Sequence, residues 1–63
     1  MASPVYSYYW LCNAMRSREV VSIISVSRTY TGTINGIRVE DGSGRRFLVN
    51  VVGYSQWIYV RAE

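Results

Sequence analysis

The sequence predicts one small, mainly β domain over residues 1–63: a curled antiparallel sheet or SH3-like barrel of four or five strands, with allowance for one short N-terminal helix. From Glu19 onward, β-branched and aromatic residues dominate, and these fit a pleated surface better than a helix. Turn signals rich in glycine separate short apolar runs. A chain of 63 residues is too short for a second domain, and it buries only about 60% of its unfolded surface.

Residues 4–16 fit two structures. Ser3 followed by Pro4 is typical of a helix N-cap and first helical position. Apolar residues recur at helical spacing, at Val5, Tyr8, Tyr9, Cys12 and Met15. Against a helix, five of the residues from Val5 to Trp10 are aromatic or β-branched. A strand is therefore the favoured interpretation, and a helix is the alternative.

The apolar run EVVSIISVS, residues 19–27, predicts a strand whose alternation is broken. Val21 and Ile23 share one face of an extended chain, whereas Ile24 and Val26 share the other. This pattern predicts either a β-bulge near Ser22–Ile24 or a strand covered on both faces.

Two turn signals follow. Asn35-Gly36 predicts a two-residue hairpin turn or, alternatively, a bend within one long strand. Residues 41–44, DGSG, predict a hairpin that brings residues 38–40 beside residues 45–47. This loop leads into a strand rather than a helix, so it lacks the helix N-terminus on which phosphate-binding loops depend. We interpret it as a structural turn.

The last two apolar runs alternate cleanly. Phe47, Val49 and Val51 fall on one face of an extended chain, with Leu48, Asn50 and Val52 opposite. In the final run, Ile58 and Val60 oppose Trp57, Tyr59 and Arg61. These runs predict two core strands.

Most catalytic chemistry lacks its residues in this chain. There is no histidine, a single cysteine, and only four acidic residues. Glu40 and Asp41 are adjacent, so on a strand they point to opposite faces and cannot form a close carboxylate pair. Cys12 has no histidine to activate it, and we interpret it as a packing residue. We therefore expect no enzyme, cofactor, metal site or small-molecule substrate.

Targeting signals are also missing from the sequence. No early basic segment precedes an apolar run, and no run approaches the roughly 18 apolar residues of a membrane span. A lone cysteine fits a reducing compartment. We expect a cytoplasmic protein without membrane contact.

The aromatic content suggests the leading functional hypothesis, which is a protein-binding module. Six tyrosines, two tryptophans and one phenylalanine exceed what so small a core can hold. Tyrosine, tryptophan and arginine are enriched at protein-interface hot spots. We expect a homo-oligomer that contacts another protein, such as a small accessory or inhibitor protein of a bacterium or phage. The predicted partner-binding residues are Tyr8, Trp10, Trp57, Tyr59 and Arg61.

The alternative hypothesis is a small nucleic-acid-binding β-barrel. The net charge is +3, and all seven basic residues are arginines. Basic loops beside aromatic rings are typical of proteins that bind single-stranded nucleic acid, since the charges follow the backbone and the rings stack on bases. The loop arginines predicted for this role are Arg16, Arg18, Arg45 and Arg46.

Overall fold

The computed structural model describes residues 4–40, 42 and 45–63, which form one helix and six strands arranged as two sheets. The elements are β1 (Val5–Tyr6), α1 (Tyr8–Ser17), β2 (Val21–Ile24), β3 (Thr29–Gly32), β4 (Ile34–Glu40), β5 (Arg46–Val51) and β6 (Ile58–Ala62). The larger sheet has the order β1-β6-β5-β4, and β2 and β3 form a separate antiparallel hairpin. The prediction of a mainly β chain with one short helix is confirmed.

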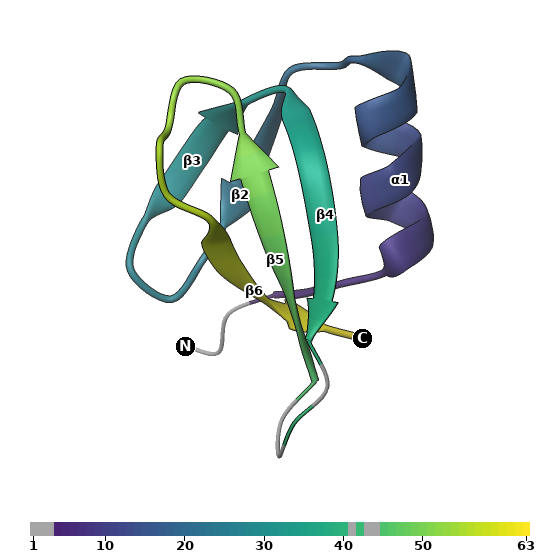
Figure 1. Cartoon of the computed structure of the whole chain (residues 1–63), viewed down its shortest axis with the longest axis vertical. Coiled ribbons are helices and arrows are strands. Elements are labelled where there is room, and N and C mark those ends of the chain that lie inside the picture. Colours follow the sequence, from purple (N-terminus) through teal and green to yellow (C-terminus); the bar gives the residue numbers. More distant parts are fainter. Residues whose placement is uncertain (1–3, 41, 43–44) are drawn as a thin grey trace.

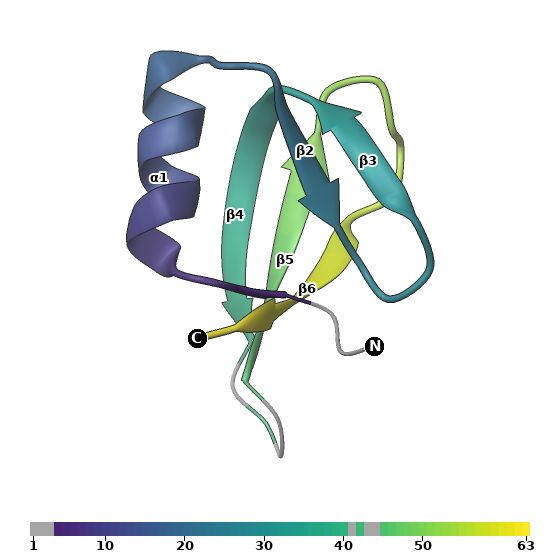
Figure 2. The same ribbon diagram turned by 180° about the vertical axis from the view of Figure 1, so that it is seen from behind.

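The core lies on one face of the larger sheet. The β2–β3 hairpin covers this inner face, and α1 lies along the β4 side of the sheet, as the two opposite views show (Figures 1 and 2). The buried residues are Leu11, Ala14, Ile23, Ile34, Phe47, Val49, Val51, Ile58 and Val60. The alternation predicted for the last two strands is confirmed, since Phe47, Val49 and Val51 are buried on β5 and Ile58 and Val60 on β6.

The favoured strand over residues 4–16 is wrong, and the helical alternative describes most of this segment. Only Val5–Tyr6 forms a strand among the described residues of this segment, and it pairs in parallel with the end of β6. The helix begins after Ser7 rather than after Ser3, because the Ser7 hydroxyl accepts a hydrogen bond from the Trp10 backbone N–H at 3.0 Å. Tertiary packing outweighs aromatic β propensity here, since the helix buries Leu11 against the sheet.

Both interpretations of the broken alternation in residues 19–27 are wrong. β2 pairs with β3 in a regular register without a bulge, and its two faces differ, since Ile23 is fully buried while Ile24 is 44% exposed. The alternation ends because the strand ends at Ile24. Val26 belongs to the turn that follows, where it is 79% exposed.

At Asn35-Gly36, the bend within a longer strand is confirmed and the two-residue hairpin is wrong. Both residues lie inside β4, where the register with β5 shifts between Ile34 and Gly36. A Cβ atom on Gly36 would lie 2.9 Å from Cη2 of Trp57. Glycine is therefore needed here for the close approach of an indole ring rather than for a turn.

The second predicted turn, at residues 41–44, lies outside the described residues except for Gly42. The strands on either side of it are antiparallel neighbours, with Glu40 opposite Arg46 and Val39 opposite Phe47. This pairing is the one that a hairpin at this position predicts.

Of the two predicted architectures, the curled sheet is present and the closed barrel is not. β2 and β6 do not pair, so the two sheets remain separate along this side. The Tyr6 hydroxyl accepts a hydrogen bond from the Ile24 backbone N–H at 2.9 Å. A side chain thereby joins β1 to the edge of β2, where a closed barrel would have a neighbouring strand.

We expect Tyr6→Phe to lower the free energy of unfolding by about 1 kcal/mol, because it removes this link between the sheets. Urea denaturation followed by circular dichroism measures the change. Tyr9→Phe is the control, because Tyr9 is 78% exposed. Equal stability losses in the two variants would contradict the structural role of the Tyr6 hydroxyl.

Candidate functional site

The face of the larger sheet opposite the core carries ordered polar and aromatic side chains. In the register of the sheet, Leu48 lies between Arg38 on β4 and Tyr59 on β6. On β5 and β6 these positions alternate with buried ones, so their side chains face away from the core, and Arg38 shares this face as the cross-strand neighbour of Leu48. Figure 1 views this outer face, with β4 and β5 in front of the hairpin.

Arg38 and Trp57 form the first of two stacked pairs on this face. The Arg38 guanidinium carbon lies 4.7 Å from the centroid of the Trp57 ring. The indole ends close to Gly36 on β4, which is separated from β6 by β5 in the sheet. Contact at this distance is a cation–π interaction that restrains both side chains.

Arg46 and Tyr59 form the second pair, on the neighbouring strands β5 and β6. The Arg46 guanidinium carbon lies 4.6 Å from the centroid of the Tyr59 ring. Its Nε also donates a hydrogen bond to Glu40 Oε1 at 3.1 Å, with both side chains substantially exposed. A charge-assisted hydrogen bond of this kind fixes the guanidinium in place even though an exposed ion pair adds little stability. We call Arg38, Trp57, Arg46 and Tyr59 the outer-face cluster.

A second arginine–tyrosine group lies beside this cluster. The Arg28 guanidinium carbon is 4.8 Å from the Tyr30 ring and 5.4 Å from the Tyr54 ring. The two rings meet edge to face, with centroids 4.9 Å apart. A hollow of about 180 Å³ is lined by all three of these residues and by Trp57. The hollow joins the Arg28 group to the outer-face cluster, so rings and guanidinium groups follow one another along the surface.

Positive charge dominates this surface. Arg28, Arg38 and Arg46 belong to it, and Glu40 is the acidic residue that accompanies them among the described positions. Of the other described acids, Glu19 accepts a hydrogen bond from Ser17 at the end of α1, and Glu63 ends the chain beside Tyr6. The surface is therefore suited to an anionic ligand.

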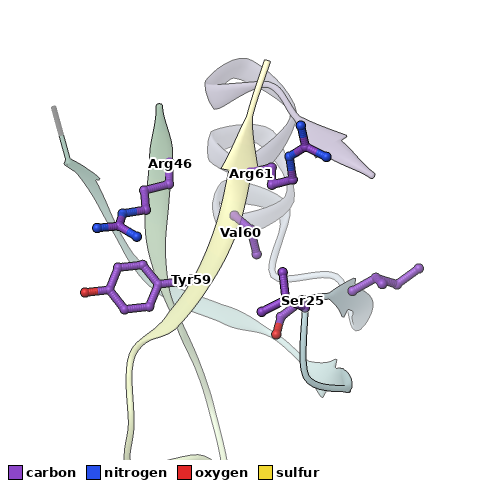
Figure 3. A pocket seen from close by; sticks show the side chains of 7 residues that line it. Ser25, Arg46, Tyr59, Val60 and Arg61 are labelled. Carbon is purple, nitrogen blue, oxygen red and sulfur yellow. The ribbon is translucent and has the colours of Figure 1, made fainter. Parts of the chain in front are cut away.

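The five predicted partner-binding residues do not share one surface. Trp57 and Tyr59 lie in the outer-face cluster, whereas Tyr8 and Trp10 lie on α1. The Trp10 ring contacts the Tyr6 ring at a centroid distance of 5.5 Å, and Tyr8 contacts Phe47 at 5.9 Å. Arg61 lies opposite Arg46 in the register, on the same face of β6 as Tyr59, but its side chain extends away from both of theirs (Figure 3).

The four loop arginines are also divided. Arg16 lies in the last turn of α1 and Arg18 caps that helix, near Val52 at the end of β5. Arg45 and Arg46 lie at the opposite end of β5, where the strand begins. Only Arg46 belongs to the outer-face cluster. The four loop arginines predicted to contact nucleic acid therefore do not gather at one end of the fold.

Sequence reasoning missed Arg28, Tyr30, Arg38 and Tyr54 as site residues. Arg38 and Glu40 fall on the same side of an extended chain, so a pairing between these two residues would be the simplest expectation from the sequence. In the structure, Glu40 binds Arg46 across the strands instead, and this leaves Arg38 to cover Trp57. The sequence feature that could have identified Arg38 as a site residue is an arginine at a strand position whose side chain faces away from the core.

Cys12 is half-buried rather than fully buried, and it is unpaired with another cysteine. Its side chain raises the pKa of the Tyr8 phenol above the usual value, first through a hydrogen bond and then through charge repulsion. Within the described part of the chain, no three histidine, cysteine or acidic side chains gather to hold a metal ion. No helix among those residues is long and apolar enough to cross a membrane.

The chain matches no protein-family model, no curated protein and no solved structure. Its function must therefore be argued from its own side chains.

Proposed function

We propose that this chain is a non-catalytic module that binds single-stranded nucleic acid on its outer face. One observation carries the proposal: two stacked arginine–aromatic pairs lie on one open sheet face, the first with its indole against Gly36 and the second hydrogen-bonded to Glu40. Proteins that bind single strands combine cationic groups, which contact the phosphates, with flat surfaces on which the bases stack.

The chemistry of the pairs supports an unpaired strand as the ligand. Bases stack on aromatic rings and also on the planes of guanidinium groups. Each pair of the outer-face cluster, Arg38 with Trp57 and Arg46 with Tyr59, combines a ring with a guanidinium group. A duplex hides its base faces inside the helix, so stacking groups gain nothing from it. Arg28 extends the track beyond Trp57 and supplies a further phosphate contact.

The protein-binding hypothesis is supported less well by this face, because Tyr8 and Trp10 lie elsewhere and the exposed groups are mainly cationic. Self-association stays a prediction, and sedimentation at micromolar concentration tests it. A cytoplasmic location and a role as an accessory or inhibitor protein of a bacterium or phage likewise remain expectations from the sequence.

We expect the chain to bind a fluorescent oligothymidylate of about ten nucleotides with a marked dependence on salt. Contact with three or four phosphates gives a slope of about −2 to −3 in a plot of log K against log salt concentration. Fluorescence anisotropy measured from about 50 to 200 mM salt should then show a loss of affinity of roughly 20- to 50-fold.

The same oligonucleotide annealed to its complement is the control for strandedness, and it should bind more weakly than the single strand. A salt slope near zero, or equal affinity for the duplex, would contradict the proposed function.

A further inference from the structure

A second surface lies where the two sheets fail to close. Here a cavity of about 240 Å³ separates the end of β2 from β6. Figure 3 shows Val60 and Ser25 on the two sides of this gap, with Arg61 at its end. The described residues that line it are Ile24, Ser25, Val26, Arg46, Tyr59, Val60 and Arg61. We call this gap the seam.

The β6 backbone has an edge at the seam that, apart from β1, pairs with no strand among the described residues. The Ala62 N–H donates to the Arg45 carbonyl at 3.2 Å, and the register then directs the peptide groups of Val60 and Ile58 toward β5 as well. The N–H and C=O of Tyr59 therefore point the other way. β1 covers that edge only beside Arg61 and Ala62.

β2, on the opposite side of the seam, also has an edge that pairs with no strand among the described residues. The Ser25 N–H donates to the Arg28 carbonyl at 3.0 Å, so Ile23 directs its peptide groups toward β3 and Ile24 directs its own away from β3. The Ile24 N–H is bound by the Tyr6 hydroxyl. The seam thus lies between two strand edges, and exposed edges of this kind accept an added strand.

The side chains that line the seam determine which residues an added strand would need in order to bind there. Ile24, Val26 and Val60 make one part apolar, and Ile24 and Val26 remain largely exposed to water. Arg46 and Arg61 add two positive charges, and none of the described residues that line the cavity is acidic. Between described residues the single ion pair joins Arg46 to Glu40, so Arg61 has no carboxylate partner there. An acidic group at the end of the seam would provide one.

We propose that the seam binds an extended segment of another protein, in which apolar residues alternate with acidic ones, as an added strand along β6. In such a strand, successive side chains point to opposite faces. Apolar residues would then lie on the side of Val60 and Ile24, and acidic residues on the side of the arginines. A volume of about 240 Å³ is below the roughly 300–1,000 Å³ of small-molecule sites, and it suits individual side chains of a peptide.

The test uses a capped seven-residue peptide in which valine and aspartate alternate, and a matched peptide with lysine in place of aspartate. Titration into the ¹⁵N-labelled chain, followed by nuclear magnetic resonance, gives the affinity and the amide exchange rates. We expect the acidic peptide to bind and to slow exchange of the Tyr59 amide, because its N–H would join a strand ladder. The lysine peptide should not bind.

Three variants locate the site. Arg61→Gln should weaken binding of the acidic peptide about three- to fivefold, the range of an exposed ion pair, whereas Arg16→Gln on α1 should leave it unchanged. Trp57→Ala should retain peptide binding, because Trp57 lies outside the seam, and this separates the inference from the proposed nucleic-acid function. Equal binding of the two peptides would overturn the proposal. So would the absence of acidic-peptide binding, or a Tyr59 amide that stays unprotected at saturation.

Discussion

Trp57→Ala is expected to weaken binding of the oligothymidylate by about 5- to 150-fold, corresponding to the 1–3 kcal/mol of one base–aromatic stack. The substitution removes the ring that Arg38 covers, and so it dismantles one of the two pairs in the outer-face cluster. Arg38 then loses the group that restrains it, so the phosphate contact weakens together with the stacking. Fluorescence anisotropy at constant salt measures the loss.

Trp10→Ala is the matched control, because the two tryptophans have similar exposure, 37% for Trp57 and 43% for Trp10. Trp10 lies on α1 against Tyr6, outside the outer-face cluster. Trp57→Phe adds a second comparison, since a smaller ring retains part of the stacking surface. A loss of affinity with Trp10→Ala as large as that with Trp57→Ala would show that the outer-face cluster is not the binding site.

The strands that form the centre of the sheet could be predicted from the sequence. In β5 and β6, apolar and polar residues alternate with the period of a strand, and the register places Val49 opposite Ile58 on the buried face. A local pattern suffices there because each strand has one face on the core and one in solvent. The same alternation correctly put Trp57 and Tyr59 on the side opposite Ile58.

The N-terminal segment could not be predicted from its own residues. Its aromatic residues favour a strand by propensity, but the outcome depends on what Leu11 packs against. The Ser7 cap was a local signal, yet Ser3-Pro4 offered a competing helix start a few residues earlier. Helix and strand differ here through contacts with the sheet, which a local pattern does not contain.

The site was harder to predict than the fold, because it depends on pairings across strands. Asn35-Gly36 has the composition of a turn, but Gly36 serves the Trp57 ring, which comes from a distant part of the chain. Likewise, Arg38 could be assigned to Trp57 only once Glu40 was known to bind Arg46. The residue types in the sequence predicted a surface of arginines and aromatic rings. Which arginine contacts which ring depends on the register of the strands.

Leu11→Ala is expected to have the largest effect on stability, lowering the free energy of unfolding by about 2–5 kcal/mol. Leu11 is fully buried and belongs to the core cluster that attaches α1 to the sheet. A chain of 63 residues has a total stability of only about 3–9 kcal/mol, so the variant loses much of it. The melting temperature should fall by about 8 °C or more, as measured by circular dichroism.

Leu48→Ala is the control for Leu11→Ala, because Leu11 and Leu48 are the two leucines of the chain and Leu48 lies outside the core. Leu48 is half-buried on the outer face between Arg38 and Tyr59. Its removal opens no enclosed cavity, since water and neighbouring side chains can fill the space, and we expect a cost of about 1 kcal/mol. If Leu11→Ala lowered the free energy of unfolding as little as Leu48→Ala does, α1 would contribute little to the core. The helix would then be a peripheral element, and the β2–β3 hairpin alone would cover the inner face.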